Sequence, residues 1–287
     1  MDPDSDFYGD EDTISALQAR VDNFDIESWW ENRNEGANPT PREDANSSSF
    51  MGHLHNRYEG VPGAWQLSES VDDFLARLPP ATTNWQPGLD WIFIANPFIP
   101  KETDQAHEAF VEGGTERLRI FSSFIEQSKG SGKSPFVVSR EISKARKEVV
   151  QDLRELAADC NVLHGKWMLF LEPNAVNEVW TTVARATANN ELGTAAKVDT
   201  RVSSEKERLI CVYTKDFRDE DDVARVLSRL RQLELVRVGG KYIYYKSDAW
   251  TGVGIYGGNQ WGIKASMYSS SEIFAYIKKK GNLPARC

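Results

Sequence analysis

The chain has 287 residues, of which 40% are apolar and 27% are charged, a composition typical of a globular protein with one large or two small domains. The longest apolar runs, Trp167–Leu171 and Leu209–Tyr213, fall far short of the roughly 20 residues that a membrane span needs. The first residues, MDPDSDFYGDED, lack the basic and apolar stretches of a secretory signal. Three cysteines far apart in the chain (Cys160, Cys211 and Cys287) fit a reducing compartment. We therefore expect a cytoplasmic or nuclear protein without a membrane segment.

The net charge of −9 is confined to one end of the chain. Residues 1–35 hold eleven acids and two arginines, whereas residues 36–287 hold 32 acids and 32 bases. The acidity of the whole chain therefore does not argue against an anionic ligand for residues 36–287.

Residues 1–60 are rich in Asp, Asn, Ser and Gly, and we expect them to form a mostly disordered acidic tail. Residues 61–287 are then expected to form a single domain. Within the tail, residues 21–30 cluster apolar side chains among acids and end on Trp29 and Trp30. Two interpretations stay open for this cluster: it docks on the domain or on a protein partner, or it forms no lasting structure.

Apolar periodicity and turn residues predict the elements that follow the tail. The expected helices cover residues 71–78, 104–128 (broken or kinked at Gly113-Gly114), 143–160, 175–188, 219–233 and 270–280. The expected strands cover residues 90–95, 166–171, 195–202, 209–214, 252–256 and 262–268, with a hairpin of 235–238 and 241–246 around Gly239-Gly240. Strands joined by hairpins and by helices on one side predict an α+β fold with a mainly antiparallel sheet.

Motifs typical of enzymes, such as nucleotide-binding loops and metal-ligand clusters, are weak in this sequence. Residues 130–134 (GSGKS) lack the first glycine of a phosphate-binding loop, and Pro135 follows, so we interpret them as a linker. Residues 252–257 match GxGxxG by letter, but no βαβ unit surrounds them. The four histidines show no metal-ligand spacing: His53, His55, His107 and His164. We therefore predict a non-enzymatic protein without a metal or a cofactor.

Basic and aromatic residues carry the remaining signal. Between Lys129 and Lys147 there are six bases and one acid, which fits either a solvated helix start or a surface for an anionic partner. A second basic group contains Lys166, Lys197, Arg201, Lys206 and Lys246. Trp91, Trp167 and Trp180 are expected in the core, whereas Trp250, Tyr256 and Trp261 lie among Gly, Asn and Gln, where stacking on a ligand is plausible.

Four segments resemble the basophilic-leukemia-expressed-protein-like family over about residues 65–268. They are HGKWMLFL, VNEVWTTVARATANNELGTAAKV, LICVYTKDFRDEDDV and YYKSDAWTGVGIY. The resemblance implies the fold of the cap-binding translation initiation factor 4E, a curved antiparallel sheet backed by three main helices on one face. In that factor an arginine and a lysine bind the phosphates of the mRNA cap, and the resemblance places Arg201 and Lys206 on these positions. The stacking Trp and adjacent Glu of that factor fall on Leu156-Ala157, so we expect no recognition of methylguanine.

Together these features predict a binder of single-stranded RNA or of a phosphorylated nucleotide. The expected site residues are Arg201, Lys206, Lys166, Lys197 and Lys246 for phosphates and Trp250, Tyr256 and Trp261 for stacking. An alternative stays open. The domain could instead be a protein-interaction module that binds its partner through the helical face or the Trp29/Trp30 tail, with the groove vestigial.

Overall fold

The computed structural model describes residues 54–101, 105–203 and 206–281. The chain divides into two units, Met1–Met51 and Gly52–Cys287, and the described residues belong to the second. Most of the predicted acidic tail, including Trp29 and Trp30, lies outside the described residues. None of the helices in the described ranges is long and apolar enough to cross a membrane.

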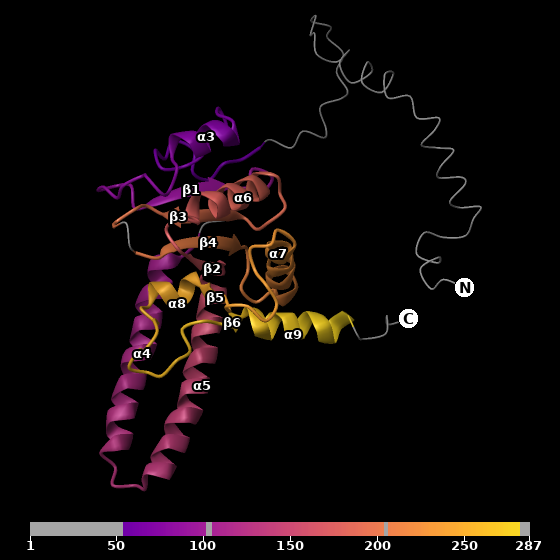
Figure 1. Ribbon diagram of the computed structural model, residues 1–287. Coiled ribbons are helices and arrows are strands. Elements are labelled where there is room, and N and C mark those ends of the chain that lie inside the picture. Colours follow the sequence, from indigo (N-terminus) through magenta and orange to yellow (C-terminus); the bar gives the residue numbers. More distant parts are fainter. Residues whose placement is uncertain (1–53, 102–104, 204–205, 282–287) are drawn as a thin grey trace, which may run out of the picture. The chain divides into compact units, whose positions relative to one another are not determined.

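Six strands form one open antiparallel sheet with the order β1-β3-β4-β2-β5-β6 (Figure 1). The strands are β1 (Trp91–Ala95), β2 (Gly165–Leu171), β3 (Ala195–Asp199), β4 (Arg208–Thr214), β5 (Tyr244–Ser247) and β6 (Tyr268–Ser269). In the register of the three central strands, Trp167 of β2 lies opposite Val212 and Tyr245. Because successive side chains of a strand point to opposite faces, Lys166 and Trp167 belong to different faces of the sheet.

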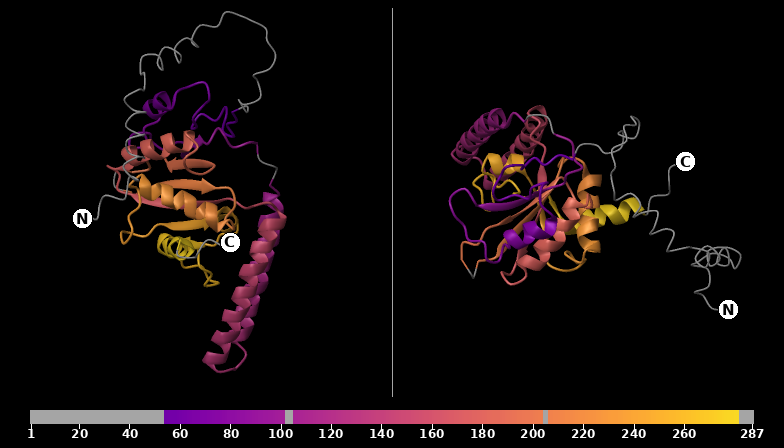
Figure 2. Two further views of the ribbon diagram at one scale, coloured as in Figure 1. Left: turned by 90° about the vertical axis from the view of Figure 1, so that its right-hand side faces the viewer. Right: turned by 90° about the horizontal axis from the view of Figure 1, so that it is seen from above.

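Seven helices are present in the described residues. They are α3 (Val71–Arg77), α4 (His107–Lys129), α5 (Pro135–Asp159), α6 (Val176–Ala188), α7 (Glu220–Gln232), α8 (Asp248–Gly252) and α9 (Ser270–Gly281). Helices α6 and α7 contact the sheet on one face, and α3 contacts α6. Helices α4 and α5 pack side by side as a long antiparallel hairpin that extends beyond the sheet (Figures 1 and 2). The predicted α+β class with an antiparallel sheet is therefore confirmed.

The core lies between the sheet and helices α6 and α7. Trp167 and Trp180 are fully buried there, as predicted. The indole N–H of Trp167 donates a hydrogen bond to the Val223 carbonyl of α7 at 3.1 Å. The Trp180 ring meets Phe74 of α3 edge to face, with ring centroids 6.5 Å apart. Two large aromatic side chains thus join the sheet to its helices.

Residues 54–60, which we assigned to the tail, pack against the domain instead. Asn56 is buried, and its amide donates to the Trp65 carbonyl at 2.6 Å. The Tyr58 ring lies 4.9 Å from the Phe93 ring of β1. The ordered part of the domain therefore starts before residue 61.

Several predicted boundaries are wrong for physical reasons. Helix α4 runs unbroken through Gly113 and Gly114. Gly114 serves close packing instead of a kink, because a Cβ there would lie 2.7 Å from a methyl group of Val253. Helix α5 starts eight residues earlier than expected, with Pro135 in its first turn, where proline is tolerated.

The predicted hairpin of 235–238 with 241–246 is also wrong, because only Tyr244–Ser247 forms a strand and it pairs with β2 and β6. The expected strands 252–256 and 262–268 are not formed, apart from Tyr268 in β6. Instead, Ser247 caps the short helix α8 by accepting a hydrogen bond from the Trp250 amide at 3.2 Å.

Candidate functional site

The face of the sheet opposite α6 and α7 carries three lysines, one each on β3, β2 and β5. Lys166 of β2 lies directly opposite Lys246 of β5 and Tyr213 of β4. Lys197 of β3 lies opposite Cys211 of β4, two residues along from Tyr213. The alternation along each strand places these side chains on one surface, which we call the lysine face.

Lys166 occupies the centre of the lysine face and is buried. Its ammonium group forms an ion pair with Asp248 at the start of α8, and it lies 3.5 Å from the Thr251 hydroxyl. The same ammonium lies 5.5 Å from the centroid of the Tyr213 ring. A buried ammonium needs such a partner, because an unpaired charge away from water is very costly.

Lys197 lies between two aromatic rings. Its ammonium is 4.0 Å from the centroid of Trp91 and 5.7 Å from the centroid of Tyr213. Burial lowers the pKa of Lys197, and the nearby charge of Lys166 lowers that pKa further. Trp91 is therefore not a fully buried core residue as predicted, but a half-buried wall of the lysine face.

Lys246 is capped by the Tyr256 ring, which follows α8. The ammonium lies 3.9 Å from the ring centroid, a cation–π distance. Burial is the main cause that lowers the pKa of Lys246 to about 8; Lys166 adds to the shift and Asp248 opposes it. Among the described residues, Asp248 pairs with Lys166, and the Asp199 carboxylate on β3 pairs with Arg208, so the positive charge of the three lysines favours an anionic ligand.

Aromatic rings are exposed beside these charges. On β2 and β5 the alternation that gives Lys166 and Lys246 also places Phe170 and Tyr244 on the lysine face. Phe170 and Tyr244 are each 42% exposed, and Tyr256 is 54% exposed. Exposed rings on a sheet that also carries lysines provide flat surfaces on which bases can stack.

The structure unites only part of the predicted site. Lys166, Lys197, Lys246 and Tyr256 come together on the lysine face, whereas the other predicted residues lie elsewhere. The Arg201 guanidinium donates to the Asn84 side chain at 2.9 Å, beyond the end of β3. Lys206 is exposed in the β3–β4 connection, where no described residue pairs with its ammonium.

The expectation that Trp250 is exposed for stacking is wrong, because its side chain is 2% exposed and packs in the core. Trp261 is half-buried against the α4–α5 hairpin, where its indole N–H donates to the Ser122 hydroxyl at 2.8 Å. Both tryptophans lie in or beside the irregular segment after β5 that sequence reasoning took for strands.

Sequence reasoning missed Phe170, Tyr244, Tyr213 and Asp248. A signal for the first two exists. Once Trp167 is assigned to the core, the strand period of two sends Lys166 and Phe170 to the other face, and the same period places Tyr244 on the face of Lys246. Tyr213 joins the site through the pairing of β2 with β4, and Asp248 joins it because α8 starts directly after β5. The sequence of a single strand reveals neither neighbour.

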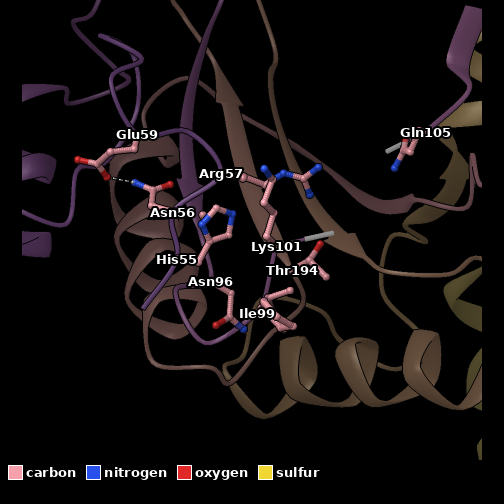
Figure 3. A pocket seen from close by; sticks show the side chains of 11 residues that line it. His55, Asn56, Arg57, Glu59, Asn96, Ile99, Lys101, Gln105 and Thr194 are labelled. Carbon is pink, nitrogen blue, oxygen red and sulfur yellow. Dashed lines mark hydrogen bonds between the residues drawn. The ribbon is translucent and has the colours of Figure 1, made fainter. Parts of the chain in front are cut away.

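A separate polar cavity of about 370 Å³ lies where β1 ends and β3 begins, lined by residues from 55–59, 95–105 and Thr194 (Figure 3). Its amide side chains serve the fold. Asn56 donates to Glu59 at 3.1 Å, and Asn96 donates to the Asn190 side chain at 2.8 Å. Two cations, Arg57 and Lys101, line this cavity together with the Glu59 carboxylate and the His55 ring, and its lining contains no Phe, Tyr or Trp.

A family model described as Basophilic leukemia-expressed protein Bles03 matches residues 17–254. The chain belongs to this family. The resemblance found in the sequence segments is thereby confirmed, and the match of the Bles03 family extends from the N-terminal segment to α8.

Two solved structures are similar over a smaller part of the chain. One is Ascaris suum eIF4E-3 in complex with an m2,2,7G cap, with 16% sequence identity and a TM-score of 0.28. The other is the same protein in complex with an m7G cap, with 18% identity and a TM-score of 0.27. Each overlap covers 38% of this chain and 58% of the other, so the chain spans little more than half of these structures. TM-scores this low do not bear on the function of the lysine face.

A stability measurement can test the environment of Lys246. Its pKa of about 8 lies below the ordinary value of 10.5, so the fold disfavours the charged form. Below pH 8 the ammonium stays charged in the folded state, and this cost is fully present. Between pH 8 and 10.5 the unfolded chain binds more protons than the folded one at this site, so stability gains with rising pH.

We therefore expect Lys246→Met to match or exceed the wild type in unfolding free energy at pH 7. The advantage of the variant should shrink steadily from pH 8 to 10, as followed by urea unfolding. If the variant is less stable than the wild type at pH 7, and if the difference in unfolding free energy does not change with pH, then burial of the charged Lys246 does not destabilise the fold.

Proposed function

We propose that this member of the Bles03 family is a non-enzymatic binder of single-stranded RNA and that the lysine face is its binding surface. Phosphates lie against Lys197, Lys246 and Lys166, and bases stack on Phe170, Tyr244 and Tyr256. The observation that carries the proposal is the combination of three convergent ammonium groups with three exposed rings on the sheet face that α6 and α7 leave uncovered.

Both parts of this surface have a known energetic role. Phosphate contacts supply affinity through release of counterions, and each stacked base adds about 1–3 kcal/mol. A partly desolvated ammonium binds a phosphate more strongly than one in water, because the interaction is less screened. The burial of Lys197 and Lys246 thus favours a phosphate contact over a contact with solvent.

The competing interpretation, a protein-interaction module that uses the helical face, finds less support. The large apolar side chains that are exposed in the described residues include none from α6 or α7; those on helices are Ile120 of α4 and Phe136 and Val137 of α5. A docking face on these helices would need a contiguous apolar patch. The sheet face, in contrast, exposes three rings.

The proposed binding surface does not recognise a methylated cap. The positions that the resemblance assigns to the stacking Trp and its Glu fall inside helix α5, where Ala157 is fully buried. Retention on a cap-analogue resin should therefore be competed equally by methylated and unmethylated guanosine nucleotides. Selective competition by the methylated nucleotide would contradict this part of the proposal.

The proposed stacking of bases is tested by removing Tyr256, the most exposed of the three rings on the lysine face. Tyr256→Ala should weaken binding of an oligouridylate by about 1–3 kcal/mol, or roughly 5- to 150-fold. The dependence of affinity on salt should stay unchanged, because stacking releases no counterions. Fluorescence anisotropy at several salt concentrations measures both quantities.

The matched control for this measurement is Tyr256→Phe, which keeps the ring and should bind like the wild type. If the alanine variant binds as tightly as the phenylalanine variant, Tyr256 does not stack on a base.

A further inference from the structure

A second basic surface lies away from the lysine face, along the α4–α5 hairpin. A groove of about 670 Å³ runs between the hairpin and the loop of residues 259–262. We call it the hairpin groove; the residues used here are Lys129, Lys133, Ser139, Ser143, Arg146 and Trp261. No carboxylate lines it among the described residues, although helix α5 also carries several acids. The sequence alone fits two interpretations of the basic run Lys129–Lys147, a solvated helix start or a surface for an anionic partner. In the structure, three cations of this run line one groove.

Arg146 is held in place at the wall of the hairpin groove. Its Nε donates to the Trp261 carbonyl at 2.8 Å, and no carboxylate pairs with it in the described part of the chain. The loop can approach this closely because residue 262 is glycine with φ +63°: a Cβ there would lie 3.0 Å from an Arg146 nitrogen. The guanidinium is therefore oriented by the fold and keeps its charge for an anion.

The two lysines of the groove differ in their partners. Lys129 is exposed and has no ion pair among the described residues. Lys133 pairs with Glu141 at 2.8 Å, but both side chains are well exposed, and such pairs contribute little and exchange easily. Two serine hydroxyls, Ser139 and Ser143, complete a lining of the kind that contacts phosphates.

A short segment connects the two basic surfaces. Tyr256, which caps Lys246 on the lysine face, lies five residues before Trp261 in the hairpin groove. Five residues span at most about 18 Å, even when fully extended. A chain of nucleotides that leaves the lysine face at Tyr256 therefore reaches the groove within a few nucleotides.

We propose that the hairpin groove binds phosphates of the same RNA strand whose bases stack on the lysine face. This inference rests on the proposed function and adds a length requirement: an RNA that covers only the lysine face lacks the groove contacts. Lysine, arginine and serine contacts to phosphates carry no sequence information, so the groove adds affinity and direction to the bound strand without base preference.

The test compares a short and a long ligand. Oligouridylates of about 4 and about 20 nucleotides, a span suggested by known single-strand site sizes, are titrated against each full-length variant by anisotropy. The groove variant is Lys129→Gln with Lys133→Gln, which changes only exposed side chains and leaves the anchored Arg146 intact. The control variant is Lys278→Gln with Lys279→Gln, which removes the same charge from exposed positions on α9.

We expect the groove variant to bind the long oligouridylate about 10-fold or more weakly near 0.1 M salt, with a logarithmic salt slope smaller by about 1–1.5. Its affinity for the short oligouridylate should equal that of the wild type, and the α9 control should match the wild type for both. If the groove variant binds the long ligand like the wild type, the groove proposal is wrong while the proposed function stands.

Two other outcomes separate the remaining possibilities. If neither ligand binds the wild type at low salt, the proposed function itself fails, and the groove proposal with it. If polyglutamate competes for the groove as well as the long oligouridylate does, and the groove variant loses only the peptide, the groove serves an acidic protein and the proposal is overturned.

Discussion

Replacing Lys197 and Lys246 together by glutamine should remove two phosphate contacts from the lysine face. For single-stranded nucleic acid each contact contributes about 0.7 to the logarithmic salt slope, so the slope should fall by about 1.4. Near 0.1 M salt this corresponds to a loss of affinity of roughly 25-fold. Lys166 is left unchanged on purpose, because its removal would leave the Asp248 carboxylate without its ion pair.

The readout is anisotropy of a labelled oligouridylate over a series of salt concentrations. The double variant Lys278→Gln with Lys279→Gln, on α9, removes the same formal charge far along the chain and should change neither slope nor affinity. A double lysine variant with the wild-type slope would place the phosphates elsewhere. Arg201 and Lys206, in the connection between β3 and β4, would then be the next pair to change.

Trp167→Ala should cost about 3–5 kcal/mol of unfolding free energy, the range for large aromatic truncations in a core. The side chain is fully buried, its ring meets Tyr245 edge to face at 5.3 Å, and its N–H bonds to α7. The substitution would therefore leave a large cavity and remove the indole donor from the Val223 carbonyl, which would keep only its partner within the helix.

Chemical denaturation of purified protein measures this cost. The matched control is Trp85→Ala, since Trp85 is 49% exposed and should lose less than about 1 kcal/mol. Equal stability of the two variants would contradict the assignment of Trp167 to the core between the sheet and α7.

The sequence predicted most of the elements because their signals are local. Strands β2 and β4 are apolar runs bounded by polar residues, and α7 has apolar residues at helical spacing behind an Asp219 cap. The region after β5 was predicted wrongly, because the glycines at positions 252, 254 and 257 are also typical of a bent strand. Its actual conformation depends on a serine cap at Ser247 and on packing against α4.

The candidate site was harder to predict than the fold. Lys166, Lys197, Lys246 and Tyr256 were chosen for their chemistry, and the sheet register is what brings them together. The resemblance implies phosphate roles for Arg201 and Lys206; the structure pairs Arg201 with Asn84 and leaves Lys206 exposed in the β3–β4 connection.

Strand order decides which lysines become neighbours in the sheet. Strand β4 lies between β2 and β3 in space, although it follows both in the chain. No local pattern specifies such an order, so the site could be predicted as residue types but not as an arrangement.

The central claim, that single-stranded RNA lies on the lysine face, is tested most directly by photocrosslinking. The full chain would be irradiated with an oligonucleotide that contains 4-thiouridine, and the modified peptides identified by mass spectrometry. We expect crosslinks at Phe170, Tyr244 or Tyr256, reduced by Lys197→Gln with Lys246→Gln. Crosslinks confined to helices α6 and α7, or none at low salt, would contradict the claim.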